Sequence, residues 1–279
     1  MMEWWHAVII GIVEGITEFL PISSTAHIGF FTSMFGYSST EASVVAFSAI
    51  IQAGAIAAAV IYFWKDISRT ALAFFKGLFN KSERKNFDYK FGWLILIGSL
   101  PIVITGVFLQ DFVETAVRSL WWMVAGLLGF TFVLWWADRM GTRRRKEKSM
   151  TTKDSIIIGL IQALSLIPGV SRSGAATAAG LLQGFDRVTT TRLAFFLGIP
   201  ALVGAAVLQI AAHYDEIGAG VGWTATIIGT VVSFIVAFVC IDWLLKFVSR
   251  RSFAVFIWYR FALGALLVVL LLTGVITTA

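Results

Sequence analysis

EGITEFLPISSTAH (residues 14–27) and PGVSRSG (residues 168–174) are two polar segments in an otherwise apolar chain. Together they hold two carboxylates, a histidine, an arginine and several hydroxyls. Ionisable side chains at membrane depth are expensive, so they mark candidate functional positions. Each segment also contains a proline, which removes a helical hydrogen bond, so each predicts a break between two short helices.

The composition of the whole chain is that of an integral membrane protein. Hydrophobic residues make up 58% and charged residues 14% of the 279 residues, and the mean hydropathy is +0.85. Apolar runs long enough to cross a bilayer as helices cover residues 45–64, 91–110, 118–137, 192–212, 222–245 and 254–276. We therefore expect an all-α polytopic membrane protein, with residues 1–279 forming a single integral membrane domain.

The basic residues lie in connectors between these runs. The formal net charge is +6, and most Lys and Arg residues fall within residues 65–90, 138–153 and 246–251. The positive-inside rule places these three connectors in the cytoplasm, next to anionic lipid, so no nucleic-acid partner is expected. Connector 213–221 has two acidic residues and no Lys or Arg, which places it outside.

The chain aligns with itself at one offset, which places residues 9–14 on residues 157–162 and the first polar segment on the second. We call this the repeat offset. Several matches at one offset predict two related halves, approximately residues 1–147 and 148–279.

The loop charges decide how each half begins. Segment 154–182 starts and ends in the cytoplasm and is broken at Pro168, so it is expected to be a re-entrant helical hairpin rather than a crossing. By the repeat, residues 5–30 form the matching hairpin, broken at Pro21 and entering from outside. Each half then has one hairpin and three spans, in an inverted-topology repeat whose binding site lies where the hairpin tips meet.

The first segment carries paired acids. Glu14 and Glu18 are four residues apart, so a helix places both on one face. Two carboxylates in a low-dielectric cavity repel one another unless a proton or a cation lies between them. Oxygen ligands favour Mg²⁺ or Ca²⁺ over Zn²⁺. The alternative is that the acids balance buried basic groups, with Glu18 pairing with Arg172.

Hydroxyl groups follow the first break. Ser23, Ser24 and Thr25 can cap the next helix, or they can form an anion cradle with its free N–H groups. One hydroxyl can act as a nucleophile if His27 or a glutamate takes its proton. The alternative for His27 is a hydrogen bond between helices.

The second segment supplies the complementary charge. Arg172 offers a planar fork that matches two phosphate oxygens and keeps its charge when buried. Ser171, Ser173 and Gly174 flank it. Arg260 lies in the predicted span 254–276, near its cytoplasmic end, where it can pair with Asp242 or extend to the interface.

The two segments resemble the motifs of the undecaprenyl-diphosphate phosphatase family, also known as bacitracin-resistance proteins. That family carries E-G-x-T-E-F-L-P-[VI]-S-S-T-G-H near the N-terminus and P-G-x-S-R-S-G-[AS]-T in the second half. Residues 14–27 match the first motif except at Ala26, and residues 168–175 match the second, with Ala176 where the family has Thr. The resemblance covers essentially the whole chain.

The resemblance implies a bacterial plasma-membrane enzyme that removes the terminal phosphate of undecaprenyl diphosphate at the outer face. Such an enzyme recycles the lipid carrier for cell-wall synthesis and confers bacitracin resistance. The resemblance implies support by Mg²⁺ or Ca²⁺, with Glu14 and Glu18 as metal ligands or general bases. It makes Ser24 the candidate nucleophile, assisted by Thr25 and His27. The expected substrate-binding residues are Ser23, Ser171, Arg172, Ser173 and Gly174.

A transporter is the rival class, because inverted repeats with broken helices are a transporter layout. A polyprenyl-phosphate flippase or an anion transporter would use the same site. The sequence leaves open whether a serine or a metal-bound water attacks phosphorus. It is also compatible with a homo-oligomer.

Overall fold

The computed structural model describes residues 1–38, 41–116 and 120–274, and their regular structure is helical apart from one isolated β-bridge. Its elements, in chain order, are α1 (Trp4–Thr17), α2 (Ser24–Met34), α3 (Ala42–Tyr62), α4 (Trp64–Phe79), η1 (Lys81–Lys85), α5 (Phe87–Ala116), α6 (Leu120–Met140), η2 (Glu147–Ser149), α7 (Thr152–Ala163), η3 (Leu164–Leu166), α8 (Arg172–Leu182), α9 (Arg187–Ala219), α10 (Trp223–Arg250) and α11 (Ala254–Leu272).

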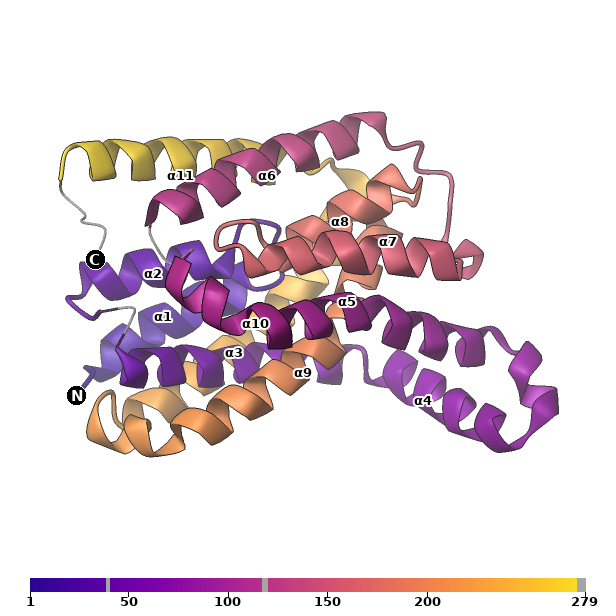
Figure 1. Ribbon diagram of the computed structural model, residues 1–279, viewed down its shortest axis with the longest axis horizontal. Helices are drawn as coiled ribbons and strands as arrows, with labels where there is room; N and C mark the ends of the chain where they lie inside the picture. Colours follow the sequence, from indigo (N-terminus) through magenta and orange to yellow (C-terminus); the bar gives the residue numbers. More distant parts are fainter. Residues whose placement is uncertain (39–40, 117–119, 275–279) are drawn as a thin grey trace.

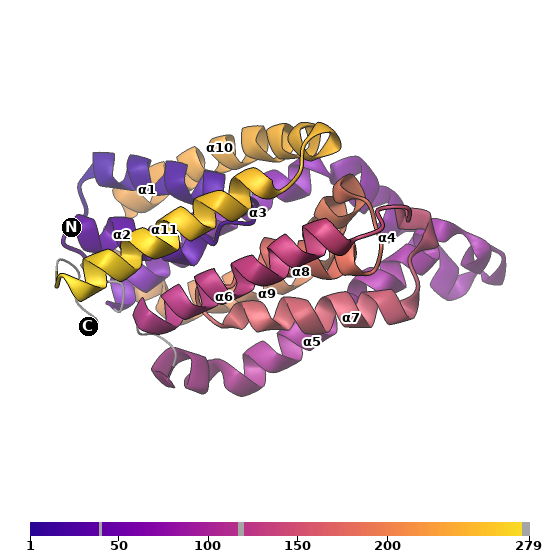
Figure 2. The same ribbon diagram turned by 90° about the horizontal axis from the view of Figure 1, so that it is seen from above.

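Six of these helices are long and apolar enough to cross a membrane: α3, α5, α6, α9, α10 and α11. They run side by side along the long axis of the molecule (Figures 1 and 2). The predicted all-α polytopic membrane fold with six spans is confirmed. Positions 118–119 and 275–276, at the predicted ends of two spans, lie outside the described residues.

The two polar segments interrupt pairs of short helices, as predicted. α1 and α2 are separated at residues 18–23, and α7 and α8 at residues 164–171, where η3 provides one short turn. Figure 1 shows the two pairs folding back from opposite ends of the molecule, α1 from the end that holds the N-terminus and α7 from the other. This arrangement is what two re-entrant hairpins of opposite direction require.

Glycines let each hairpin pack closely against a long span. In the α1–α10 contact, a Cβ at Gly11 would collide with the backbone carbonyl of Gly229. In the α7–α5 contact, a Cβ at Gly159 would collide with the carbonyl of Gly98. Gly11 and Gly159 are related by the repeat offset, and small residues at such contacts are what bring membrane helices together. Each hairpin therefore packs on a span of the other predicted half, although the division into halves stays a prediction.

Candidate functional site

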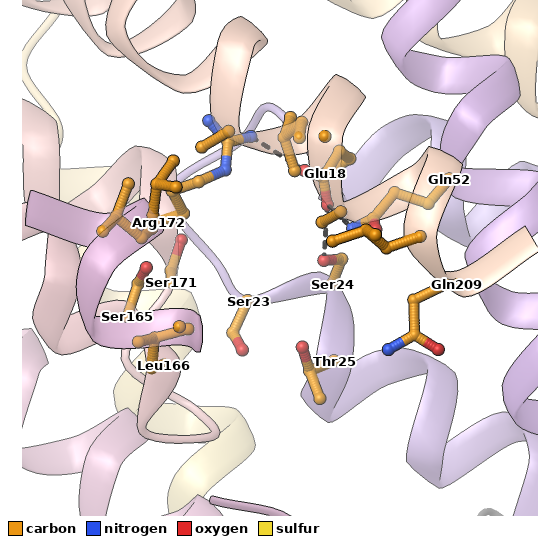
Figure 3. Close-up of a pocket in the computed structure, with 18 of the residues that line it drawn as sticks. Glu18, Ser23, Ser24, Thr25, Gln52, Ser165, Leu166, Ser171, Arg172 and Gln209 are labelled. Carbon is orange, nitrogen blue, oxygen red and sulfur yellow. Dashed lines mark hydrogen bonds and ion pairs between the residues drawn. The ribbon is translucent and has the colours of Figure 1, made fainter. Parts of the chain in front are cut away.

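The polar residues of both tips line one cavity of about 640 Å³. Its remaining wall is apolar and comes mainly from α5 and α9. Figure 3 shows how the polar side chains converge from several elements. Its labelled polar residues are Glu18, Ser23, Ser24, Thr25, Gln52, Ser165, Ser171, Arg172 and Gln209. The structure thus brings six of the predicted site residues to one cavity: Glu18, Ser23, Ser24, Thr25, Ser171 and Arg172.

Glu18 is the centre of the polar end. Its Oε1 accepts from Arg172 Nη2 at 2.8 Å, and its Oε2 accepts from Ser24 Oγ at 2.8 Å and from Gln52 Nε2 at 3.3 Å. The pair is well shielded, since the side chains of Glu18 and Arg172 are 4% and 11% exposed. The alternative pairing of Glu18 with Arg172 is therefore present, and it joins the two tips. Charge-assisted bonds of this kind are strong where water is scarce.

The end of α1 explains why Glu14 and Glu18 share a face. Glu18 follows the last helical residue but keeps helical geometry, and its N–H donates to the Glu14 carbonyl at 3.0 Å. Glu14 is 3% exposed and is not among the residues that line the cavity. Its Oε1 is buried with no hydrogen-bond partner in the described structure. Such an orphaned carboxylate oxygen requires a proton or a cation.

The two tips use the same backbone turn but different capping. Ser23 and Ser171, related by the repeat offset, both have positive φ, +74° and +73°, a conformation rare for non-glycine residues. Ser171 Oγ accepts from Gly174 N at 3.2 Å and caps α8. Ser23 makes no side-chain cap for α2, and its hydroxyl points into the cavity (Figure 3). Ser171 therefore caps its helix, whereas the cap considered for Ser23 is absent among the described residues.

Ser173 and Gly174 do not line the cavity. The Ser173 hydroxyl donates to the Leu20 carbonyl at 3.0 Å, so it links the second tip to the first. Gly174 uses its N–H on the Ser171 cap. Their contact with substrate stays a prediction.

His27 faces away from the main cavity. Its Nδ1 lies 2.7 Å from the Ser23 carbonyl, and its Nε2 lies 2.6 Å from the Tyr259 hydroxyl on α11. Both ring nitrogens are therefore engaged, and the ring lines a second, largely apolar cavity of about 340 Å³. In this arrangement the side chain that accepts from the Ser24 hydroxyl is Glu18 rather than His27.

Other contributors to the site were missed from the sequence. A Cβ at Gly198 of α9 would overlap Arg172 Nη1, so this glycine makes room for the arginine. Gln209 of α9 lines the cavity, and its Oε1 is buried without a partner among the described residues. A polar residue inside an apolar span could have identified Gln209, because the same signal identified the acids. Nothing in the sequence distinguishes Gly198 from other helix glycines.

The expectation for Arg260 was wrong. It neither pairs with Asp242 nor reaches the interface, because its side chain is fully buried. Asp242 instead accepts from Lys246 at 2.6 Å and from Tyr62 at 3.1 Å.

Comparison with known proteins places the chain among full-length relatives. A family model described as bacitracin resistance protein BacA matches residues 7–266. "Undecaprenyl-diphosphatase 3" of Frankia casuarinae is 49% identical over 276 residues, which cover 99% of each chain. "Undecaprenyl-diphosphatase" of Cutibacterium acnes is 47% identical and covers 99% of this chain and 100% of its own. "Undecaprenyl-diphosphatase 1" of Streptomyces avermitilis is 46% identical, with 98% of each chain covered.

Proposed function

The chain belongs to the family of bacitracin resistance protein BacA, and we propose that it hydrolyses undecaprenyl diphosphate to undecaprenyl phosphate and inorganic phosphate. It is a membrane hydrolase that recycles the lipid carrier of cell-wall synthesis and thereby confers bacitracin resistance. The observation that carries this proposal is the amphiphilic cavity. One end presents Arg172, Glu18 and Ser24, and the other is lined by apolar side chains.

The apolar wall fits a lipid chain. Its lining includes Val103 and Val107 of α5 and Leu208 of α9. These side chains are 42%, 64% and 66% exposed and belong to helices long and apolar enough to cross a membrane. We propose that the cavity opens to the bilayer, so that the isoprenoid chain stays in an apolar medium while the diphosphate reaches the tips.

Arg172 is the group that recognises the diphosphate. Its guanidinium is held by a single carboxylate oxygen of Glu18. A diphosphate offers more charge and several oxygens, and a guanidinium binds two phosphate oxygens in parallel. The substrate therefore competes with Glu18 for Arg172, and the displaced carboxylate becomes free to accept a proton.

Ser24 is the nucleophile in this proposal. Its hydroxyl already donates to Glu18 Oε2, which is the geometry of a nucleophile and its base. The serine oxygen bonds to the terminal phosphorus, the bridging P–O bond breaks, and undecaprenyl phosphate leaves. Glu18 accepts the serine proton. A water then attacks the phosphoserine phosphorus, the bond from phosphorus to the serine oxygen breaks, and Glu18 returns its proton to that oxygen. Both hydrogens of the water leave with inorganic phosphate, so the serine hydroxyl and the Glu18 carboxylate are restored. Thr25, Ser23 and Ser171 flank the reacting groups and are proposed to bind phosphate oxygens.

We propose Mg²⁺ or Ca²⁺ as the cofactor, held by Glu14 and Glu18. The orphaned Glu14 Oε1 supports this, because it lacks a partner that a cation would supply. No cluster of three or more His, Cys, Asp and Glu side chains occurs among the described residues. Two carboxylates suit Mg²⁺, which takes its other ligands from water and substrate phosphates. The bound cation would neutralise phosphate charge.

The proposed location is the bacterial plasma membrane, with the site open to the outer face. The cavity is lined by the later parts of α5 and α9, which run toward the end that holds the N-terminus (Figure 1). The basic connectors 65–90, 138–153 and 246–251 are assigned to the cytoplasm by their charge. A homo-oligomer is compatible with this arrangement and is not required by it.

Phosphate release tests the proposal. The purified full-length protein in detergent is expected to release inorganic phosphate from undecaprenyl diphosphate, with a rate that rises with added Mg²⁺ or Ca²⁺ and falls with EDTA. Monodispersity in size-exclusion chromatography shows that the sample is folded. Folded protein that releases no phosphate under any metal condition would overturn the hydrolase assignment and favour a flippase or an anion transporter.

A further inference from the structure

Arg260 is a buried cation to which the proposed mechanism gives no part. It lies on α11 and is the largest fully buried side chain among the described residues, with 0% exposure. Its hydrogen bonds within the described residues go to backbone carbonyls and one hydroxyl, and none goes to a carboxylate. Burying a charge without an opposite charge is costly in free energy. The groups that contact Arg260 therefore indicate its role.

Three of the groups that accept from Arg260 are backbone carbonyls in the two hairpin tips. Arg260 Nη1 donates to the Pro21 carbonyl of the first tip at 3.2 Å. Arg260 Nη2 donates to the Gly169 and Val170 carbonyls of the second tip, each at 3.2 Å. One guanidinium therefore bonds to the broken backbone of both tips.

The remaining bonds fix Arg260 to α6. Its Nε donates to Thr131 Oγ1 at 2.7 Å, and its Nη2 donates to the Leu127 carbonyl at 2.9 Å. Thr131 is itself fully buried. The guanidinium is therefore held in one orientation by a rigid span before it meets the tips.

The chemistry of the tips explains why an arginine is used. Their carbonyls lie outside regular helices, so no helical N–H reaches them, and little water is available at membrane depth. A guanidinium has donors in a rigid planar fork that can serve several carbonyls at once. A lysine has one nitrogen, and it cannot reach both tips in the same geometry.

We propose that Arg260 is a positioning residue that holds the two tips together, so that Ser24 and Glu18 of the first face Arg172 of the second. This inference rests on the proposed phosphatase function. The second tip without this link still carries Arg172 and still binds the diphosphate. Ser24, however, is no longer held in line with the bound phosphorus. Arg260 therefore supports the chemical step more than it supports substrate binding.

The test is a comparison of three variants by steady-state kinetics of phosphate release. Arg260→Lys keeps the charge and removes the fork, and Thr131→Val removes the acceptor that orients the fork. Arg250→Lys, an exposed arginine at the end of α10, is the matched control. A misalignment of about 1 Å can cost about 100-fold in rate. We expect kcat to fall about 10- to 100-fold in Arg260→Lys and less in Thr131→Val, with KM within about threefold of wild type.

The outcomes separate this inference from the proposed function. A wild-type protein without activity contradicts the function itself. An active wild type with an unchanged kcat in folded Arg260→Lys overturns only the positioning role. A loss confined to KM also overturns it, because Arg260 would then act on substrate affinity. If Arg260→Lys does not fold, Thr131→Val decides by the same criterion.

Discussion

The two hairpin tips have one backbone design and two chemistries. Ser23 and Ser171 occupy equivalent positions with nearly the same positive φ. The Ser171 hydroxyl caps its own helix, whereas the Ser23 hydroxyl does not cap and points into the cavity. Near the end of each preceding helix, Glu14 of the first hairpin corresponds to Gln162 of the second. The same fold element thus carries an acid in one copy and a neutral amide in the other.

The comparison teaches that two similar backbone turns meet at one cavity and carry different side chains. The first tip holds Glu18 and hydroxyls that line the cavity, which suits the proposed attack on phosphorus. The second tip holds Arg172, which suits phosphate recognition. Their one direct ion pair, between Glu18 and Arg172, joins the two functions. We expect substitutions in the first tip to affect the chemical step and those in the second to affect substrate binding and charge stabilisation.

Removal of the proposed nucleophile of the first tip should have the largest effect. We expect Ser24→Ala to lower kcat about 10³-fold or more, because the covalent route is lost. The measurement is phosphate release, with trapping of a phosphoserine at position 24 as a direct readout in wild type. Ser33→Ala, on the exposed face of the same helix, is the matched control. Substantial residual turnover in Ser24→Ala would instead favour attack by water.

Replacement of the second tip's fork should have the next largest effect. We expect Arg172→Lys to lower kcat/KM about 100-fold, because a point charge cannot bind two phosphate oxygens in parallel. Steady-state kinetics should show a raised KM together with a lowered kcat. The Arg250→Lys variant controls for a general effect of losing an arginine. A near-normal kcat/KM in Arg172→Lys would show that Arg172 does not need to bind two phosphate oxygens in parallel.

Glu14→Gln makes the first hairpin resemble the second, since Gln162 occupies the equivalent position. We expect about a 10-fold loss of activity and a higher Mg²⁺ concentration for half-maximal rate, because one carboxylate ligand is lost. Metal titration of phosphate release measures both. Glu3→Gln changes an exposed glutamate just before the same helix. This variant should show the wild-type dependence of rate on Mg²⁺ concentration. An unchanged metal response in Glu14→Gln would exclude Glu14 from the metal site.

Much of the fold could be predicted from the sequence. Membrane spans need long apolar runs, and the positive-inside rule then fixes how many crossings fit between charged connectors. The breaks at Pro21 and Pro168 follow from the lost backbone donor of proline. The repeat offset further indicated that Glu18 and Arg172 would meet, because equivalent tips of inverted hairpins meet at one place.

Directions of side chains could not be predicted in the same way. His27 follows Ser24 by three residues, but the sequence does not say which face of this helix points into the cavity. In the structure α2 is rotated so that His27 contacts Tyr259. Arg260 has the sequence context of an interfacial arginine, and only the long-range packing of α11 on α6 buries it against both tips. The need for a glycine at position 198 comes from the guanidinium of Arg172, which is distant in the sequence. These features depend on tertiary contacts, so the local sequence pattern does not predict them.

The bases of the two hairpins also differ. α7 begins with a capping box between Thr151 and Asp154, and Arg145 Nη1 donates to Asp154 Oδ1 at 2.8 Å. α1 begins after Glu3 without any side-chain cap. Burial alone would raise the pKa of Asp154, but hydrogen bonds from Arg145 and Thr151 outweigh it and hold this pKa below its usual range. The second hairpin is therefore anchored by a titratable contact that the first lacks.

This contact predicts a pH effect that is larger in the second hairpin than in the first. Because the folded-state pKa of Asp154 is lowered, its stabilisation is complete above the ordinary aspartate pKa of about 3.9 and is lost as pH falls through the lowered value. Hydrogen exchange of residues 152–163 should therefore show a local opening free energy that falls by about 1–2 kcal/mol below about pH 4, whereas residues 4–17 should change less. Asp154→Asn should show the reduced protection already at neutral pH and no further loss from this group on acidification. If both hairpins lost protection equally, or if Asp154→Asn kept the wild-type pH dependence, the anchor at the base of α7 would not be what distinguishes the two hairpins.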